Sequence, residues 1–148
     1  MTKLFGGNEM EATLEQNKIG FERLTGARIK AGYILTGLSS LFLLFDGIMK
    51  LFKPAAVING TIELGYNESV IVPLGIVLTA ITVLYLIPRT AVLGAVLLTG
   101  YLGGAVATHV RAGAGAFPTI FPVIFGVLVW GGLYLRDARI AELLPLRK

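Results

Sequence analysis

The chain contains no cysteine and only one histidine in 148 residues. The lack of cysteine excludes disulfides, thiol redox relays, iron–sulfur clusters and thiolate zinc sites. A single histidine excludes a haem or metal site built from two histidines of one chain. Charged residues are also scarce, at 15% where a soluble domain has roughly 25%. The sequence therefore indicates no metal site and no catalytic constellation, and it favours a protein that is not itself an enzyme.

Hydrophobic residues make up 55% of the chain and gather in four long segments. Each segment has about 18–22 residues, close to the roughly 20 that cross a bilayer as a helix. Backbone amide groups cannot stay unpaired in lipid, so these segments must be helical. The sequence predicts an all-α membrane protein, an antiparallel bundle with transmembrane helices at residues 31–52, 70–87, 90–110 and 117–135.

The distribution of lysine and arginine predicts the orientation of this bundle. Four spans place both termini and the turn at residues 88–89 on one side, which carries ten of the thirteen basic residues. The positive-inside rule then puts both termini in the cytoplasm, in a multi-pass protein of the cytoplasmic membrane. Because the basic residues flank apolar segments, anionic lipid headgroups are the expected partner and nucleic acid is not.

These spans divide the chain into a membrane domain and two tails. Residues 1–30 form a polar N-terminal tail, in which loose helical spacing suggests a short surface helix, and residues 136–148 form a basic C-terminal tail. The membrane domain covers residues 31–135. Its outer loop, residues 53–69, is too apolar to be freely solvated, so we expect it to lie on the membrane surface or to cap the bundle as a short helix or hairpin.

Polar residues near the outer ends of the first and third spans form the candidate site. Asp46 and Lys50 are four residues apart, which places them on one helix face as an ion pair. The third span runs in the same direction and ends with His109 and Arg111, at the same membrane depth. Intramembrane ionisable residues usually face the bundle interior. The depths predict that these four side chains meet beneath the outer loop.

Two interpretations of this group remain open. In the first, Asp46, Lys50, Tyr101, His109 and Arg111 bind a lipid-like molecule such as a quinone, whose carbonyl accepts a hydrogen bond from the histidine or the arginine. In the second, they form a structural ion-pair network that fixes helix register, with the long basic side chains reaching to the interface.

Small residues in the third span predict a helix-packing surface. Gly100 and Gly104 have the spacing of a GxxxG motif, and Gly103 lies beside them. Such a surface lets another helix approach closely. It serves packing inside the bundle or, alternatively, the seam of a homodimer.

Several segments closely resemble the DoxX-like family. They are PRTAVLGA at residues 88–95, LTGYLGGA at 98–105, HVR at 109–111, FP at 117–118 and 121–122, WGGLYLRD at 130–137 and DGIMKL at 46–51. The resemblance covers about residues 29–147. It implies a four-helix integral membrane protein, mostly bacterial, in the cytoplasmic membrane.

The wider group implies several different roles. It includes membrane subunits linked to quinone-dependent sulfur oxidation and to oxidative-stress complexes, a maturation factor for methylamine dehydrogenase, and a eukaryotic receptor-assembly factor. For this chain we expect a non-catalytic membrane subunit or assembly factor that packs against a membrane protein partner. The alternative is a quinone- or lipid-binding redox component with its polar site in the outer half of the bundle.

Overall fold

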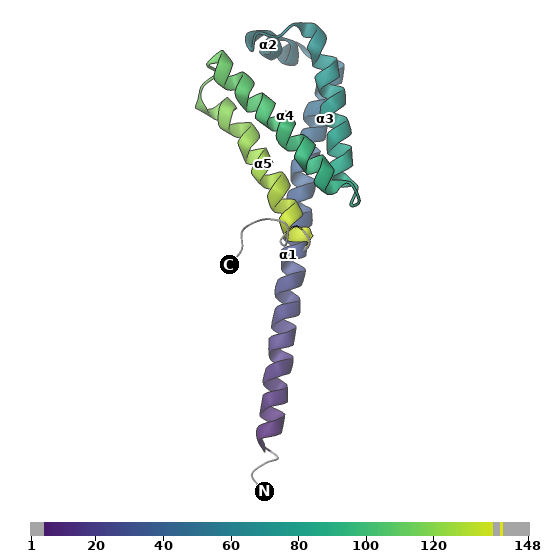
Figure 1. Ribbon diagram of the computed structural model, residues 1–148, viewed down its shortest axis with the longest axis vertical. Coiled ribbons are helices and arrows are strands. Elements are labelled where there is room, and N and C mark those ends of the chain that lie inside the picture. The colour runs from purple at the N-terminus through teal and green to yellow at the C-terminus, as the bar shows by residue number, and fades with distance from the viewer. Residues whose placement is uncertain (1–4, 138–139, 141–148) are drawn as a thin grey trace.

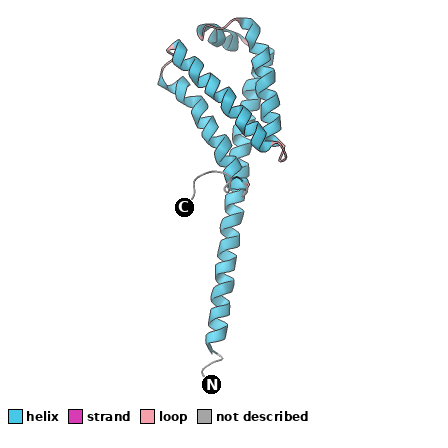
Figure 2. Cartoon of the chain, in the orientation of Figure 1, coloured by secondary structure: helices cyan, strands magenta, loops and turns pink. Residues whose placement is uncertain are grey.

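The computed structural model describes residues 5–137 and 140. Within these residues the chain is helical, without strands, and its elements follow one another through short connections (Figures 1 and 2). They are α1 (Phe5–Phe52), α2 (Ala55–Glu63), the 3-10 turn η1 (Glu68–Val70), α3 (Ile71–Leu86), α4 (Ala91–Ala112) and α5 (Ala116–Arg136).

Four helical stretches are long and apolar enough to cross a membrane. They are Thr25–Phe52, Glu68–Leu86, Ala91–Ala112 and Ala116–Arg136. These bounds lie within a few residues of the predicted spans at every end except the first, where the helix begins earlier. The prediction of an all-α bundle with four transmembrane helices is confirmed.

The first helix extends well beyond the bundle. Figure 1 shows the N-terminal half of α1 projecting as a single helix, continuous with the membrane span. Residues 5–30, expected as a tail with a short surface helix, thus belong to the same helix as the first span. No proline interrupts them, so nothing breaks the backbone hydrogen-bond ladder. Most of the predicted C-terminal tail, residues 138–139 and 141–148, lies outside the described residues.

The outer loop contains the short helix α2, one of the two forms expected for it. We call the end of the bundle near α2 the loop end, and the end from which α1 projects the stem end (Figure 1). Within the bundle, α1 packs against α3 and α5, and α4 packs against the same two helices. Helices α1 and α4 therefore lie diagonally across the bundle.

The core is narrow, and the outer surface is apolar. Side chains of all four long helices meet in it, among them Leu43, Leu78, Leu98 and Leu133, each at most 3% exposed. Most of the other large apolar side chains of the spans face outward. A soluble protein rarely exposes so continuous an apolar surface, whereas lipid solvates it.

Glycines bring neighbouring helices into backbone contact. A Cβ atom on Gly132 of α5 would lie 2.7 Å from the Thr36 hydroxyl of α1, and one on Gly75 of α3 would lie 2.8 Å from the Gly47 carbonyl. A Cβ on Gly94 of α4 would overlap the backbone of Tyr85 in α3. Three helix pairs are thus closed by contacts that tolerate no side chain.

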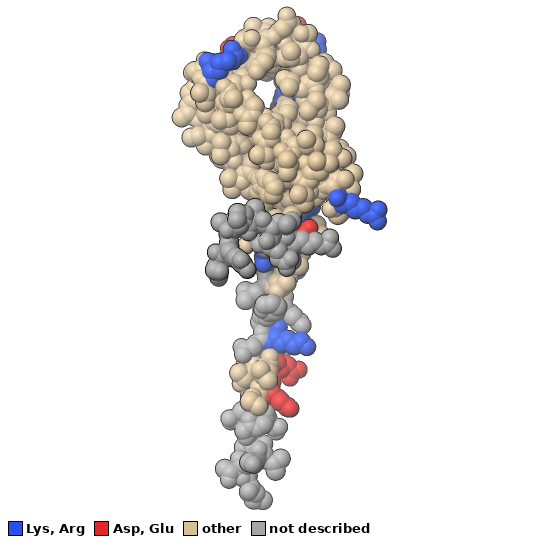
Figure 3. Space-filling model, viewed as in Figure 1, with Lys and Arg blue, Asp and Glu red and all other residues tan. Residues whose placement is uncertain are grey.

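The spacing between α1 and α5 changes along their length. At the stem end they touch through glycine, but towards the loop end Phe42 of α1 contacts Phe121 and Phe125, with ring centroids 5.4 and 4.5 Å apart. The phenylalanine rings hold the two backbones apart towards the loop end, whereas the glycines let them touch at the stem end. Helices α4 and α5 accordingly lean away from α1 and α3, and Figure 3 shows an opening through the bundle towards the loop end, with a basic side chain at its rim.

These contacts predict how single glycine substitutions affect stability. Gly94→Ala should lower the free energy of unfolding by about 1–3 kcal/mol, because the added methyl group overpacks the α3–α4 contact. Gly37→Ala is the matched control, since a Cβ there has nothing within 4 Å. Thermal or SDS unfolding of the purified protein measures both. Equal stability of the two variants would contradict the proposed contact.

Candidate functional site

The predicted ion pair on the first span is present. Lys50 Nζ lies 2.5 Å from Asp46 Oδ2, and the two side chains are 19% and 39% exposed. Tyr101 of α4, diagonally opposite, is half-buried and lies within electrostatic range of Asp46. The pair therefore faces the bundle interior, at the end where the helices separate.

Three hydroxyl groups of the bundle have spare hydrogen-bonding capacity. Within the described residues, the Tyr101 hydroxyl has no hydrogen-bond partner, and neither has the buried Ser40 Oγ of α1 or Thr79 Oγ1 of α3. Asp46 and Lys50 are thus the predicted site residues that the structure brings into contact, and the Tyr101 hydroxyl, within electrostatic range of Asp46, is not saturated.

The other two predicted residues make hydrogen bonds of their own. His109 Nδ1 lies 2.8 Å from the Ala105 carbonyl of its own helix, and Arg111 turns to the outer loop. Within the described residues neither side chain forms an ion pair with Asp46 or a hydrogen bond with Asp46 or Lys50, and the expectation that all four form one group stays a prediction. The lean of α4 carries the loop end of this helix away from α1 (Figure 1).

Arg111 instead anchors the loop between α2 and α3. Its guanidinium donates to the Leu64 carbonyl at 2.6 Å and lies 5.5 Å from the centre of the Tyr66 ring. The Tyr66 hydroxyl is 3.0 Å from the Thr108 hydroxyl, also on α4. Gly65 adopts φ +80° between the two contacts, a conformation that glycine adopts readily.

The loop is held on its other side by a second ion pair, Lys53 Nζ to Glu68 Oε1 at 2.9 Å. Glu68 is therefore engaged in an ion pair at the surface. Together the two contacts fasten this part of the chain to α4 and to Lys53, the residue that follows α1.

A buried hydroxyl network near the stem end was missed from the sequence. The Tyr85 hydroxyl donates to the Val129 carbonyl at 2.8 Å and lies 3.2 Å from the Thr36 hydroxyl. Arg136 donates to the Tyr85 carbonyl at 3.2 Å. These contacts join α1, α3 and α5. The sequence signal for this network is the set of hydroxyl residues within the first and second spans, which carry no charge and so stand out less than the charged residues.

Unlike Gly94, three glycines in the middle of α4 do not pack inside the bundle. Gly100, Gly103 and Gly104 are exposed, and a Cβ on any of them would meet nothing within 4 Å. Packing within the bundle relies on other glycines. The first of the two expected uses of this surface is therefore not seen within the chain, and contact with another chain stays a prediction.

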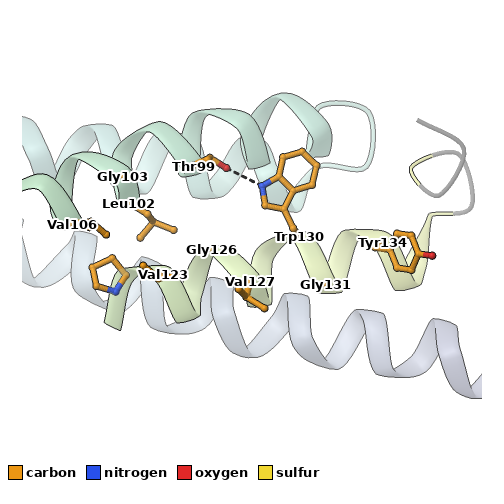
Figure 4. Close-up of a pocket in the computed structure, with 11 residues that line it drawn as sticks. Thr99, Leu102, Gly103, Val106, Val123, Gly126, Val127, Trp130, Gly131 and Tyr134 are labelled. Atoms are coloured by element: carbon orange, nitrogen blue, oxygen red, sulfur yellow. Dashed lines mark hydrogen bonds between the residues drawn. The ribbon is translucent and has the colours of Figure 1, made fainter. Parts of the chain in front are cut away.

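A groove between α4 and α5 was not foreseen. It has a volume of about 550 Å³, and Figure 4 shows the side chains along it, with glycines of both helices between them. The Trp130 indole nitrogen donates to the Thr99 hydroxyl at 2.9 Å, so the polar edge of this ring is satisfied. The groove is lined by Thr99, Leu102, Gly103, Val106, Pro122, Val123, Gly126, Val127, Trp130, Gly131 and Tyr134.

The part of the chain that the structure describes contains no cluster of three or more histidine, cysteine, aspartate or glutamate side chains that could hold a metal ion.

Comparison with known proteins gives one match. The model of a family described as the DoxX-like family matches residues 34–132, about two thirds of the chain. The matched region runs from the first span to the fifth helix and contains Asp46, Lys50 and Tyr101. No curated protein and no solved structure matches the chain.

Proposed function

The chain belongs to the DoxX-like family, and we propose that it is a non-catalytic membrane subunit or assembly factor that packs against a transmembrane helix of another protein chain. The observation that carries this proposal is the unused glycine surface of α4. Gly100, Gly103 and Gly104 are exposed in the middle of a membrane-spanning helix, and a Cβ on any of them would meet nothing within 4 Å among the described residues.

Lipid makes such a surface significant. Helices in a bilayer gain little from the hydrophobic effect when they associate, so their contacts depend on close van der Waals packing and on small residues that allow it. In this bundle other glycines, such as Gly75 and Gly94, already close the internal contacts. Gly100, Gly103 and Gly104 of α4 are therefore available to a helix of another chain, either a different protein or a second copy of this one.

The proposal includes the location of the protein. We place it in the cytoplasmic membrane with both termini in the cytoplasm, because ten of its thirteen lysine and arginine residues fall on that side. The loop end, with α2 and Arg111, then faces away from the cytoplasm, and the projecting half of α1 lies within it.

A second candidate function is the binding of a small amphiphile, such as a quinone, inside the loop end of the bundle. The opening in Figure 3 and the unpartnered Tyr101 hydroxyl favour it. The Asp46–Lys50 pair has no net charge, so it suits an uncharged head that can both donate and accept hydrogen bonds. His109 and Arg111, assigned to this role from the sequence, instead contact the Ala105 carbonyl and the Leu64 carbonyl.

The packing proposal predicts that bulky residues on α4 release the partner. The double variant Gly100→Leu with Gly104→Leu should lose the companion chain that the wild type retains in lipid nanodiscs, as measured by native mass spectrometry. Gly37→Leu, at an exposed glycine of α1 with equally open surroundings, is the matched control and should keep it. A monomer without companion in the wild type would contradict the proposal.

The orientation predicts which positions an impermeant thiol reagent reaches. Because the chain has no native cysteine, single cysteines report without background. Asn59→Cys, on α2, should react in intact cells, whereas Glu11→Cys, on the projecting part of α1, should react only after permeabilisation. The reverse pattern would invert the topology.

The second candidate predicts that the ion pair is needed for ligand retention. Asp46→Asn should reduce the amount of quinone or related amphiphile extracted from the purified protein at least severalfold, while the unfolding temperature falls little. Lys53→Gln, which breaks the other ion pair at the surface, should leave the extract unchanged. Equal effects of the two variants, or an unfolded Asp46→Asn protein, would favour a purely structural pair.

A further inference from the structure

The groove between α4 and α5 ends beside a basic side chain, and we propose that it holds one acyl chain of an anionic phospholipid whose phosphate lies at Arg28. This site shares Gly103 with the α4 glycine surface but not Gly100 or Gly104, and it is separate from the Asp46–Lys50 pair. It depends only on the protein being in a membrane, so it does not stand or fall with the partner proposed above.

The shape of the groove suits a single lipid chain. Its volume of about 550 Å³ lies within the roughly 300–1,000 Å³ typical of ligand sites. Gly103, Gly126 and Gly131 supply no side chains, and a Cβ on Gly126 would meet nothing within 4 Å. The depth of the groove therefore comes from missing side chains on both helices, between larger apolar residues on either side (Figure 4).

The length of the groove matches one leaflet. Its lining on α5 runs from Pro122 to Tyr134, a helical rise of about 18 Å. One leaflet of a hydrocarbon core that is about 30 Å thick measures roughly 15 Å. A transmembrane helix would need a contact along the whole bilayer, whereas an acyl chain needs only this depth.

The stem end of the groove is positively charged. Tyr134 lines it there, and Arg28 of α1 lies over the Tyr134 ring at 5.1 Å and donates to the Tyr134 carbonyl at 3.2 Å. Arg28 is exposed and has no carboxylate partner among the residues that the structure describes. A guanidinium with free donors at the lipid interface is well suited to a phosphate.

The aromatic residues fit the same assignment. Tryptophan and tyrosine concentrate at the level of the lipid headgroups, and Trp130 and Tyr134 lie one turn apart at this end of α5. Because Thr99 satisfies the indole nitrogen of Trp130, the ring presents apolar surface to the groove. Head and tail contacts are thus arranged in the order in which a phospholipid presents them.

Trp130 is the only tryptophan of the chain, so its fluorescence reports on the groove directly. The protein is reconstituted in dioleoylphosphatidylcholine bilayers that contain increasing fractions of a lipid brominated on its acyl chains, carrying either a phosphatidylglycerol or a phosphatidylcholine head. Brominated phosphatidylglycerol should reach half-maximal quenching at a mole fraction about fivefold lower, the preference expected from one basic residue near an anionic headgroup.

Two variants separate the head contact from the tail contact. Arg28→Gln should abolish the difference between the two lipids, whereas Arg89→Gln, at the exposed turn between α3 and α4, should preserve it. Gly126→Leu should weaken quenching by both lipids, and Gly37→Leu should not. Equal quenching by both lipids in the wild type, or a preference that survives Arg28→Gln, would overturn the proposal. So would undiminished quenching in a folded Gly126→Leu protein.

Discussion

Backbone contact at glycines is the constraint on which the rest of the bundle depends. In lipid the helices gain little from apolar burial alone, so close packing and hydrogen bonds must hold them together. Gly132 brings α5 to α1, Gly75 brings α3 to α1, and Gly94 brings α4 to α3. The hydrogen bonds of Tyr85 to Thr36 and Val129 form near two of these contacts, where the helices are close enough for one side chain to reach both neighbours.

The replacement of glycine by phenylalanine along one helix pair sets the shape of the interior. Where Gly32 and Gly132 meet, α1 and α5 touch, and where Phe42 meets Phe121 and Phe125, they are held apart. The widened end contains the Asp46–Lys50 pair, which keeps some accessible surface within the membrane domain. The helices are thus farther apart at the end of the bundle that contains this ion pair.

Much of this fold follows from the sequence, because the bilayer permits so few structures. Length and hydropathy identify the four spans, and helical spacing alone pairs Asp46 with Lys50. Contacts between side chains of different helices were harder to predict. Membrane depth places His109 and Arg111 level with that pair, but depth says nothing of how far α4 leans. The small residues of α4 indicate close packing without naming the neighbour. The groove consists largely of side chains that are missing from two helices, so neither helix alone reveals it.

Because α1 is one continuous helix, its projecting half is directly connected to the membrane span. A helix of 48 residues is about 72 Å long, and nothing in it forms a hinge between Phe5 and the membrane. This helix carries Arg28, beside the stem end of the α4–α5 groove, and Asp46, at the widened end of the bundle. A pull or a twist applied to the N-terminal end of this helix would therefore be transmitted mechanically to both sites, without an intermediate loop to absorb it.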